Sequence, residues 1–310
     1  METSAASGTS ETTDASAAYA LGYGPAERDR LRRQPDELRD DSEVLLDRVA
    51  IAEGSSVIDL GCGPQGILDL LADRAGPAGR VTGVDFHPAS VAQARTFVAE
   101  RGYQNVRVVE GDACCTGLPS GSYDLVHART LLVNAPDPAA VLTEMVRLAR
   151  PGGCVAALEP DVGASVCYPP HPAWDRMAQV FRDVTQACGI DVHIGRRLAE
   201  LFRQAGLAGI GIEARAGIYP PGHSRRTVRA DLLRSIHSQV LAKGIADERE
   251  PDEVDRAVRE HLDHPGTLVM PGLLFLAWGR TPVSADTYPW RRTGQARQGR
   301  VRAVSSGSAG

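Results

Sequence analysis

The chain has 310 residues, of which 43% are hydrophobic, and its formal net charge at pH 7 is −5. This length and composition can bury a large core in one domain with insertions. The acidic balance and the dispersed arginines argue against a nucleic-acid partner, because binding phosphates requires a basic face.

A membrane partner is not expected either. The longest apolar stretch, residues 268–278, is broken by Pro271 and is too short to span a bilayer. Residues 1–18 have neither the basic start nor the apolar centre of a signal peptide. The six cysteines show no metal-ligand spacing, so we expect reduced thiols in a cytoplasmic protein.

In chain order, the ends are expected to be disordered and a helical cap is expected to precede the core. Residues 1–17 are rich in Ser, Thr and Ala, and residues 281–310 lack hydrophobic periodicity. Residues 18–50 form the predicted cap, with one or two helices over residues 25–50.

Residues 51–160 read as alternating strands and helices, which is typical of a parallel sheet covered by helices. The first strand, residues 56–60, runs into the glycine turn Gly61-Cys62-Gly63-Pro64-Gln65-Gly66. The further strands are predicted at residues 81–85, 108–112, 123–128 and 154–158, and the helices at 67–75, 88–101 and 138–149.

Residues 161–280 complete the sheet and interrupt it with helical pieces. Strands are predicted at residues 210–219 and 273–278, and helices at 172–187, 195–205, 225–242 and 251–262. The fold class is therefore α/β, a doubly wound, mostly parallel seven-stranded sheet with helical lid insertions at about 162–190 and 221–268. Both insertions leave the carboxyl ends of strands, where open α/β sheets bind ligands, so we expect a lid over an acceptor pocket.

The glycine turn and two later acids point to a cofactor with a polar tail, a ribose and a base. Gly61 and Gly63 let the backbone approach a ligand closely, and Asp85 and Asp112 stand at strand ends. A dinucleotide fingerprint shares the glycine spacing and an acid about 20 residues on, so an NAD-dependent oxidoreductase is the alternative.

The order and spacing of five motifs separate these alternatives. They are Val57-Ile58-Asp59-Leu60-Gly61-Cys62-Gly63, Val84-Asp85, Gly111-Asp112-Ala113, Tyr123-Asp124-Leu125-Val126 and Arg150-Pro151-Gly152-Gly153. Together they resemble the Rossmann-like (class I) methyltransferases that use S-adenosyl-L-methionine (SAM), of the small-molecule type. The resemblance covers residues 45–160 and continues more loosely to residue 279.

This resemblance implies SAM as cofactor and assigns roles around it. Asp85 is expected to accept the ribose hydroxyls, Phe86 to pack on the adenine, and Asp112 with the Ala113 N–H to bind the adenine edge. Arg129 and His127 lie beside the expected methionine end. The cofactor-binding residues we expect are Tyr23, Gln34, Asp59, Gly61, Cys62, Gly63, Asp85, Phe86, Asp112, Ala113, His127 and Arg129.

The methyl acceptor is left open as a small molecule, a natural product in our interpretation, methylated at O, N or C. A hydroxyl acceptor gains from a general base, for which His127, Glu159 and His193 are the candidates. No metal is expected, because His127 and Arg129 stand where metal-dependent relatives carry acids. Asn134 replaces a histidine found in many relatives, and a structural role is expected for it.

Two further questions stay open at the level of sequence. A protein that binds SAM without transferring its methyl group has the same motifs. The segment around Tyr19 and Tyr23 is expected to close over the cofactor, docking on its own chain or on a second copy in a homo-oligomer.

Overall fold

The structure is a computed structural model and describes residues 21–283. Our expectations for residues 1–17, for Tyr19 and for residues 284–310 lie outside the described residues. The described α-helices are α1 (Pro25–Glu37), α2 (Arg39–Val49), α3 (Leu68–Ala75), α4 (Pro88–Glu100), α5 (Pro138–Leu148), α6 (Pro172–Ala187), α7 (Ile194–Gln204), α8 (Val228–Ser235), α9 (His237–Ala242) and α10 (Glu250–Asp263). The described 3₁₀ turns are η2 (Leu132–Asn134), η3 (Val162–Ala164) and η4 (Ser224–Thr227).

Seven strands form one sheet with the order β3-β2-β1-β4-β5-β9-β7. They are β1 (Ser56–Leu60), β2 (Arg80–Asp85), β3 (Val106–Glu110), β4 (Tyr123–Arg129), β5 (Ala149–Asp161), β7 (Ala208–Ala216) and β9 (Leu273–Arg280). Strands β1 to β5 pair in parallel, and β9 is antiparallel to both β5 and β7. The expected doubly wound, mostly parallel sheet is confirmed, and its strand order reverses between β1 and β4, where such folds bind ligands.

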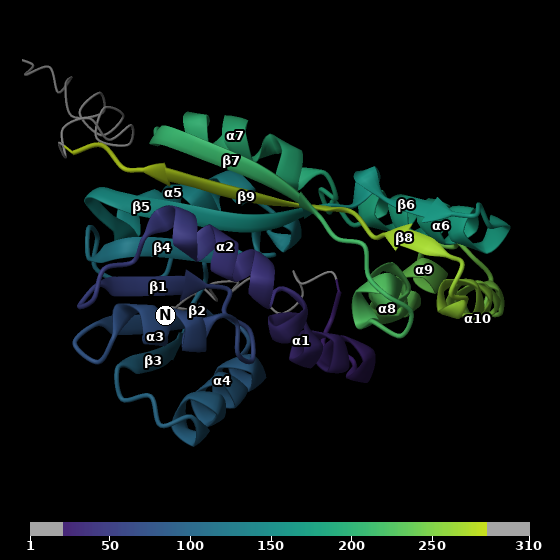
Figure 1. The fold of residues 1–310 in the computed structure, drawn as a ribbon, viewed down its shortest axis with the longest axis horizontal. Helices are drawn as coiled ribbons and strands as arrows, with labels where there is room; N and C mark the ends of the chain where they lie inside the picture. The colour runs from purple at the N-terminus through teal and green to yellow at the C-terminus, as the bar shows by residue number, and fades with distance from the viewer. Residues whose placement is uncertain (1–20, 284–310) are drawn as a thin grey trace, which may run out of the picture.

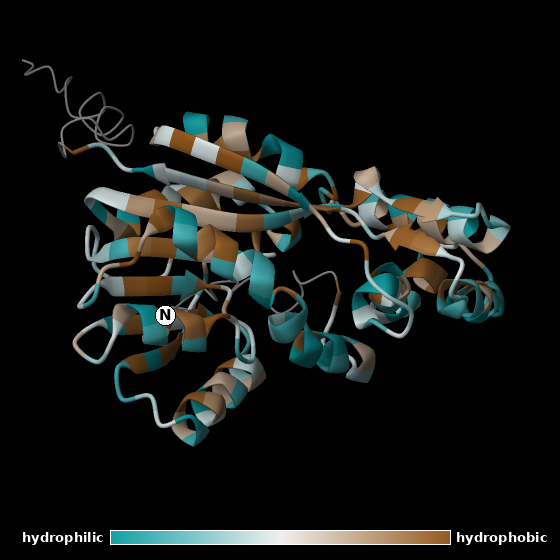
Figure 2. Ribbon diagram, viewed as in Figure 1, coloured by the Kyte–Doolittle hydropathy of each residue, from teal (hydrophilic) through white to brown (hydrophobic). Residues whose placement is uncertain are grey.

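Helices cover both faces of the sheet and bury two apolar layers (Figure 1). One layer packs Leu45 of α2, Leu71 of α3 and Ala94 of α4 against one face. The other packs Met145 of α5 and Phe202 of α7 against the opposite face. The central strands are mostly hydrophobic while the outer helices alternate in hydropathy, as expected for elements that face a core on one side only (Figure 2).

The lid is a separate body beyond one end of the sheet (Figure 1). It combines α6, α8, α9, α10 and a two-stranded sheet of β6 (Val166–Tyr168) and β8 (Leu268–Met270). Its own apolar core joins Phe181 of α6, Leu233 of α8, Leu262 of α10 and Val269 of β8. Residues from both predicted insertions lie in this body.

Two details of the lid differ from the sequence prediction. The single helix expected over residues 225–242 is wrong, because the chain breaks at Ile236 between α8 and α9 and starts as η4. The strands β6 and β8 were not predicted, since three-residue strands separated by about 100 residues leave no periodic signal. Within the described part of the chain, no helix is long and apolar enough to cross a membrane.

Candidate functional site

The glycine turn between β1 and α3 depends on three residues in the left-handed region. The φ angles of Gly61, Gly63 and Gly66 are 68°, 58° and 57°. A Cβ added to Gly61 would lie 2.8 Å from Leu131, and one on Gly66 would lie 2.6 Å from Asp59 Oδ2. No atom lies within 4 Å of a Cβ built on Gly63. The turn thus stays compact while Gly63 leaves open space above its backbone.

A cavity of about 650 Å³ opens over this turn. Ligand sites usually have volumes of roughly 300–1,000 Å³, so the space suits a nucleoside-sized cofactor. All but one of the cofactor-binding residues expected from sequence line it. They are Tyr23, Gln34, Asp59, Gly61, Cys62, Gly63, Asp85, Phe86, Asp112, Ala113 and Arg129, and the exception is His127.

Asp85, at the end of β2, is a buried carboxylate that lines this cavity. Its Oδ2 accepts the Gly63 N–H and its Oδ1 accepts the His87 N–H, each at 2.9 Å. The residue is 8% exposed, and burial raises the pKa of its carboxyl above the ordinary value. Each oxygen keeps lone pairs beyond its single backbone bond, so two hydroxyl donors of a ribose fit this group.

Aromatic rings form the wall beside Asp85. The Tyr23 ring stacks on His87 with centroids 3.5 Å apart, and meets Phe86 edge-on at 6.2 Å. Burial, with Asp85 nearby, raises the pKa of the Tyr23 phenol. The exposed Asp112 also lines this cavity and accepts the Cys114 N–H at 2.8 Å. A flat base between these groups would find apolar faces and a polar edge.

Arg129, the last residue of β4, joins the turn to the helical cap. Its Nη1 donates to Ser42 Oγ at 3.1 Å, and its Nη2 donates to the Gly66 carbonyl at 3.2 Å. Burial lowers the pKa of the guanidinium to about 10, so it stays a cation at neutral pH. It therefore brings a positive charge to the cavity wall next to the glycine turn.

His127 occupies the layer beneath the cavity. It is 0% exposed, and its Nδ1 lies 2.7 Å from Oδ1 of Asp59. Its Nε2 has no hydrogen-bond partner among the described residues. His127 lines neither this cavity nor the smaller one described below. His127 therefore has no direct access to either cavity, and its contact with Asp59 holds that carboxylate in position.

Glu159 is also an internal group. Its carboxylate accepts the backbone N–H groups of Leu131, Leu132 and Val133 at 2.8–3.1 Å, and so shapes the turn after β4. Burial outweighs these three bonds and raises the pKa of Glu159 to about 8. Glu159 lines neither cavity, so the general-base role expected for it has no support in this geometry.

His193 is the remaining candidate base, and it is partly exposed. Its Nδ1 lies 3.2 Å from Oδ1 of Asp161, which also pairs with Arg196. These partners hold the pKa of Asp161 below its ordinary value despite burial. Asp161 lines the smaller cavity but His193 does not, so a general-base role for His193 stays a prediction.

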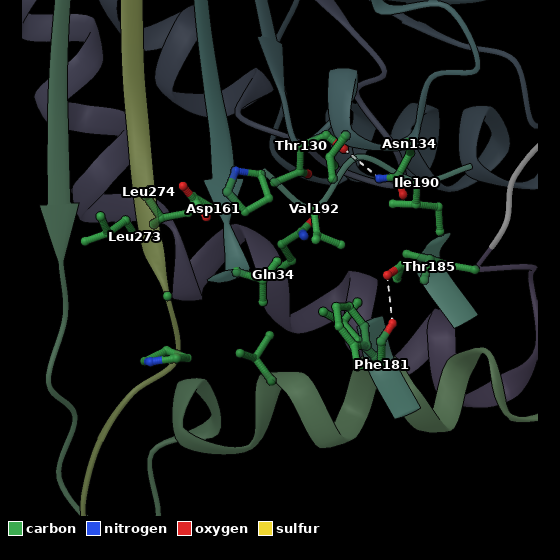
Figure 3. A pocket seen from close by; sticks show the side chains of 18 of the residues that line it. Gln34, Thr130, Asn134, Asp161, Phe181, Thr185, Ile190, Val192, Leu273 and Leu274 are labelled. Carbon is green, nitrogen blue, oxygen red and sulfur yellow. Dashed lines mark hydrogen bonds between the residues drawn. The ribbon is translucent and has the colours of Figure 1, made fainter. Parts of the chain in front are cut away.

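The smaller cavity, of about 100 Å³, adjoins the first and reaches under the lid (Figure 3). Its walls are mostly apolar and come from β9, the segment before α7, and α6. The labelled apolar residues are Phe181, Ile190, Val192, Leu273 and Leu274. Because these residues come from several elements, the sequence predicted an acceptor pocket under the lid but not the full set of side chains that line it.

Four residues line both cavities: Arg30, Gln34, Thr130 and Asn134. Asn134 Nδ2 donates to the Thr130 carbonyl at 2.9 Å (Figure 3), which is the structural role expected for Asn134. Thr130 adopts a φ of 50°, a conformation that residues other than glycine rarely adopt. The boundary between the cavities is thus built from α1 and from the turn after β4.

No group of three or more His, Cys, Asp or Glu residues within residues 21–283 could hold a metal ion. The absence of a metal requirement stays a prediction.

Comparisons with known proteins find similar sequences and folds. Residues 51–206 match the family model described as "Methyltransferase domain". A demethylmenaquinone methyltransferase from Anoxybacillus flavithermus is 29% identical over 185 residues, covering 54% of this chain and 76% of that protein. A solved structure of a putative methyltransferase from Bacillus halodurans superposes with a TM-score of 0.53 at 16% identity, covering 78% of this chain and 99% of that one.

A third relative is an uncharacterized 37.1 kDa protein in a transposon of Streptomyces fradiae. It is 36% identical over 176 residues, which is 56% of this chain and 49% of that protein. The chain therefore spans only about half the length of this relative.

Proposed function

Because this chain belongs to the methyltransferase-domain family, we propose that it transfers a methyl group from SAM to a small-molecule acceptor. The observation that carries the proposal is the pair of adjoining cavities. The larger has the residues and volume expected for a nucleoside cofactor, and the smaller is apolar. Both share the wall formed by Gln34, Thr130 and Asn134, where cofactor and acceptor would meet.

The cofactor supplies, when bound, a methyl group on a sulfonium that is already activated for in-line displacement. The contribution of the protein is then mostly positioning and exclusion of water. Asp85 would bind the ribose hydroxyls, Tyr23 and Phe86 would hold the base, and Arg129 would face the charged tail. Helix α1 and the lid would cover the acceptor, since Gln34 of α1 and Phe181 of α6 both line the smaller cavity.

The atom that accepts the methyl group stays open among O, N and C. A relative named demethylmenaquinone methyltransferase supports a small-molecule acceptor. We propose a natural product, because a single lysine among 34 basic residues is typical of high-G+C genomes, in which such pathways are common.

The NAD-dependent alternative finds no support in the site. Such a reaction often uses a Tyr/Lys pair, and the single lysine, Lys243, donates to the Ala187 carbonyl at 3.0 Å in the lid. Lys243 lines neither cavity. A protein that binds SAM without transfer remains the second candidate function, because neither His127 nor Glu159 reaches a cavity.

The test is transfer of isotopic label from methyl-labelled SAM to a panel of phenols, amines and unsaturated carboxylic acids. We expect label in at least one product with the wild-type protein, and a strongly reduced rate with Asp85→Ala. SAM binding without transfer to any member of a broad panel would favour the second candidate.

A further inference from the structure

The smaller cavity contains a buried cation whose charge nothing in the described chain balances. Arg225, in η4 at the start of the lid helix α8, lines this cavity and is 9% exposed. Its Nε is buried and has no hydrogen-bond partner, and none of its guanidinium nitrogens bonds to another described residue. The contact found for the group is the Tyr219 ring, 5.8 Å from Cζ.

The other charged residues that line this cavity are already paired. Arg30 donates to Glu27 through two nitrogens, at 2.8 and 2.6 Å. Asp161 is held by Arg196 and His193. Arg225 therefore stands alone among them, and a buried charge is costly unless it is paired. A ring face contributes much less than a carboxylate to such a group.

Two arginines next to Arg225 add positive charge, and neither lines the cavity. Nε of Arg229 is also buried without a hydrogen-bond partner among the described residues. Arg229, one helical turn further, is buried and uses Nη2 to bind the carbonyls of Val162 and Pro271, at 2.6 and 3.3 Å. Arg226 donates hydrogen bonds to the carbonyls of Tyr219, Leu262 and Thr267. These two arginines bind backbone carbonyls near the cavity, and Arg225 is the one of the three arginines that lines it.

We propose that the methyl acceptor carries a carboxylate, which Arg225 binds at the lid end of the smaller cavity. The inference rests on the proposed function, since it takes this cavity to be the acceptor pocket. One planar guanidinium with free donors matches one carboxylate in a two-point contact. A phosphate monoester carries nearly two charges, which the single Arg225 cation would balance only in part. The mostly apolar remainder of the cavity then receives the body of the molecule.

Calorimetry on the purified protein tests this without methyl transfer. The probes are benzoate, its neutral amide benzamide, and phenyl phosphate, each with and without S-adenosylhomocysteine. We expect benzoate to bind at least about tenfold more tightly than benzamide, and phenyl phosphate no more tightly than benzoate. Equal affinity for benzoate and benzamide, or no benzoate binding at millimolar concentration, would overturn the proposal. Tighter binding of phenyl phosphate than of benzoate would overturn the carboxylate and indicate a ligand with a phosphate group.

Variants assign the effect to Arg225. Arg225→Met keeps the apolar stem and should abolish the preference for benzoate while leaving benzamide binding unchanged. Arg225→Lys should restore part of the preference. Arg234→Met is the matched control, because Arg234 lies on the adjoining helix α8, is exposed and paired with Asp255, and should behave as wild type. An Arg225→Met protein that is folded by circular dichroism and keeps the preference would refute the assignment. Failure of the proposed function would appear separately, as absent SAM binding in all variants.

Discussion

Nδ1 of His127 lies 2.7 Å from Oδ1 of Asp59, and the two residues are direct neighbours in the register of β4 and β1. Both are almost fully buried, yet Asp59 lines the large cavity and His127 does not. His127 thus holds the Asp59 carboxylate in place from the layer beneath the cofactor site.

A double-mutant cycle measures this relationship. Asp59→Ala and His127→Ala should each destabilise the protein, because each leaves the other group buried without its partner. We expect a coupling free energy of about 1–3 kcal/mol in urea denaturation. The contact contributes no stability of its own if the changes in unfolding free energy of the two single mutants add up to that of the double mutant within about 0.5 kcal/mol.

The ribose role of Asp85 predicts a large loss of cofactor affinity. Asp85→Ala removes two hydrogen bonds to a charged acceptor, each worth roughly 1.5–3 kcal/mol. SAM affinity in calorimetry should fall by about one to three orders of magnitude. Asp112→Ala serves as comparison and should lose less, because Asp112 is exposed to water. Unchanged SAM binding in a folded Asp85→Ala protein rejects the ribose role.

Tyr23 is expected to act through its ring, which stacks on His87 and borders the cavity. Tyr23→Ala should weaken SAM binding by about tenfold, since the base loses one apolar wall. Tyr23→Phe keeps the ring and should bind SAM nearly as well as wild type. The account of this wall fails if the Phe variant loses as much affinity as the Ala variant.

Glu159 makes stability depend on pH in a defined direction. Its pKa is raised to about 8 in the folded protein, above the roughly 4.3 of an unfolded glutamate. Between pH values of about 4.3 and 8 the folded state binds one proton more than the unfolded state. The stabilisation that Glu159 contributes is therefore complete below about pH 4.3 and is lost as the pH rises through 8. The slope is at most about 1.4 kcal/mol per pH unit.

Comparing wild type with Glu159→Gln isolates this contribution from that of other titrating groups. Urea denaturation at several pH values should show a flatter dependence for the variant between about pH 4.5 and 8. Parallel curves for the two proteins would mean that Glu159 titrates near its ordinary value despite its burial.

Much of the fold and of the cofactor site was predictable because its signals are local. The glycine turn, with φ angles that favour glycine, and Asp85 at the end of β2 follow from short stretches of sequence. The Asp59–His127 contact was less accessible, because it joins residues 68 positions apart through strand order. The ends of β1 and β4 suggested a shared site but did not show that His127 lies beneath it.

The acceptor side was not predictable for a physical reason. Arg225 is one of many arginines, and what distinguishes it is that its buried guanidinium lines the smaller cavity without a partner for Nε among the described residues. Glu159 was a candidate general base, yet its carboxyl group accepts three backbone N–H groups in the turn after β4. These roles depend on contacts between residues far apart in the chain, which local sequence patterns do not reveal.

Calorimetric titration with SAM and, separately, with NAD tests the central claim most directly. The account predicts one SAM molecule bound per chain with micromolar affinity, and weak or absent binding of NAD. The residues that line the large cavity, above all Asp85 and the glycine turn, should account for the difference between the affinities for SAM and NAD. Micromolar binding of NAD with no response to SAM or S-adenosylhomocysteine would contradict the account.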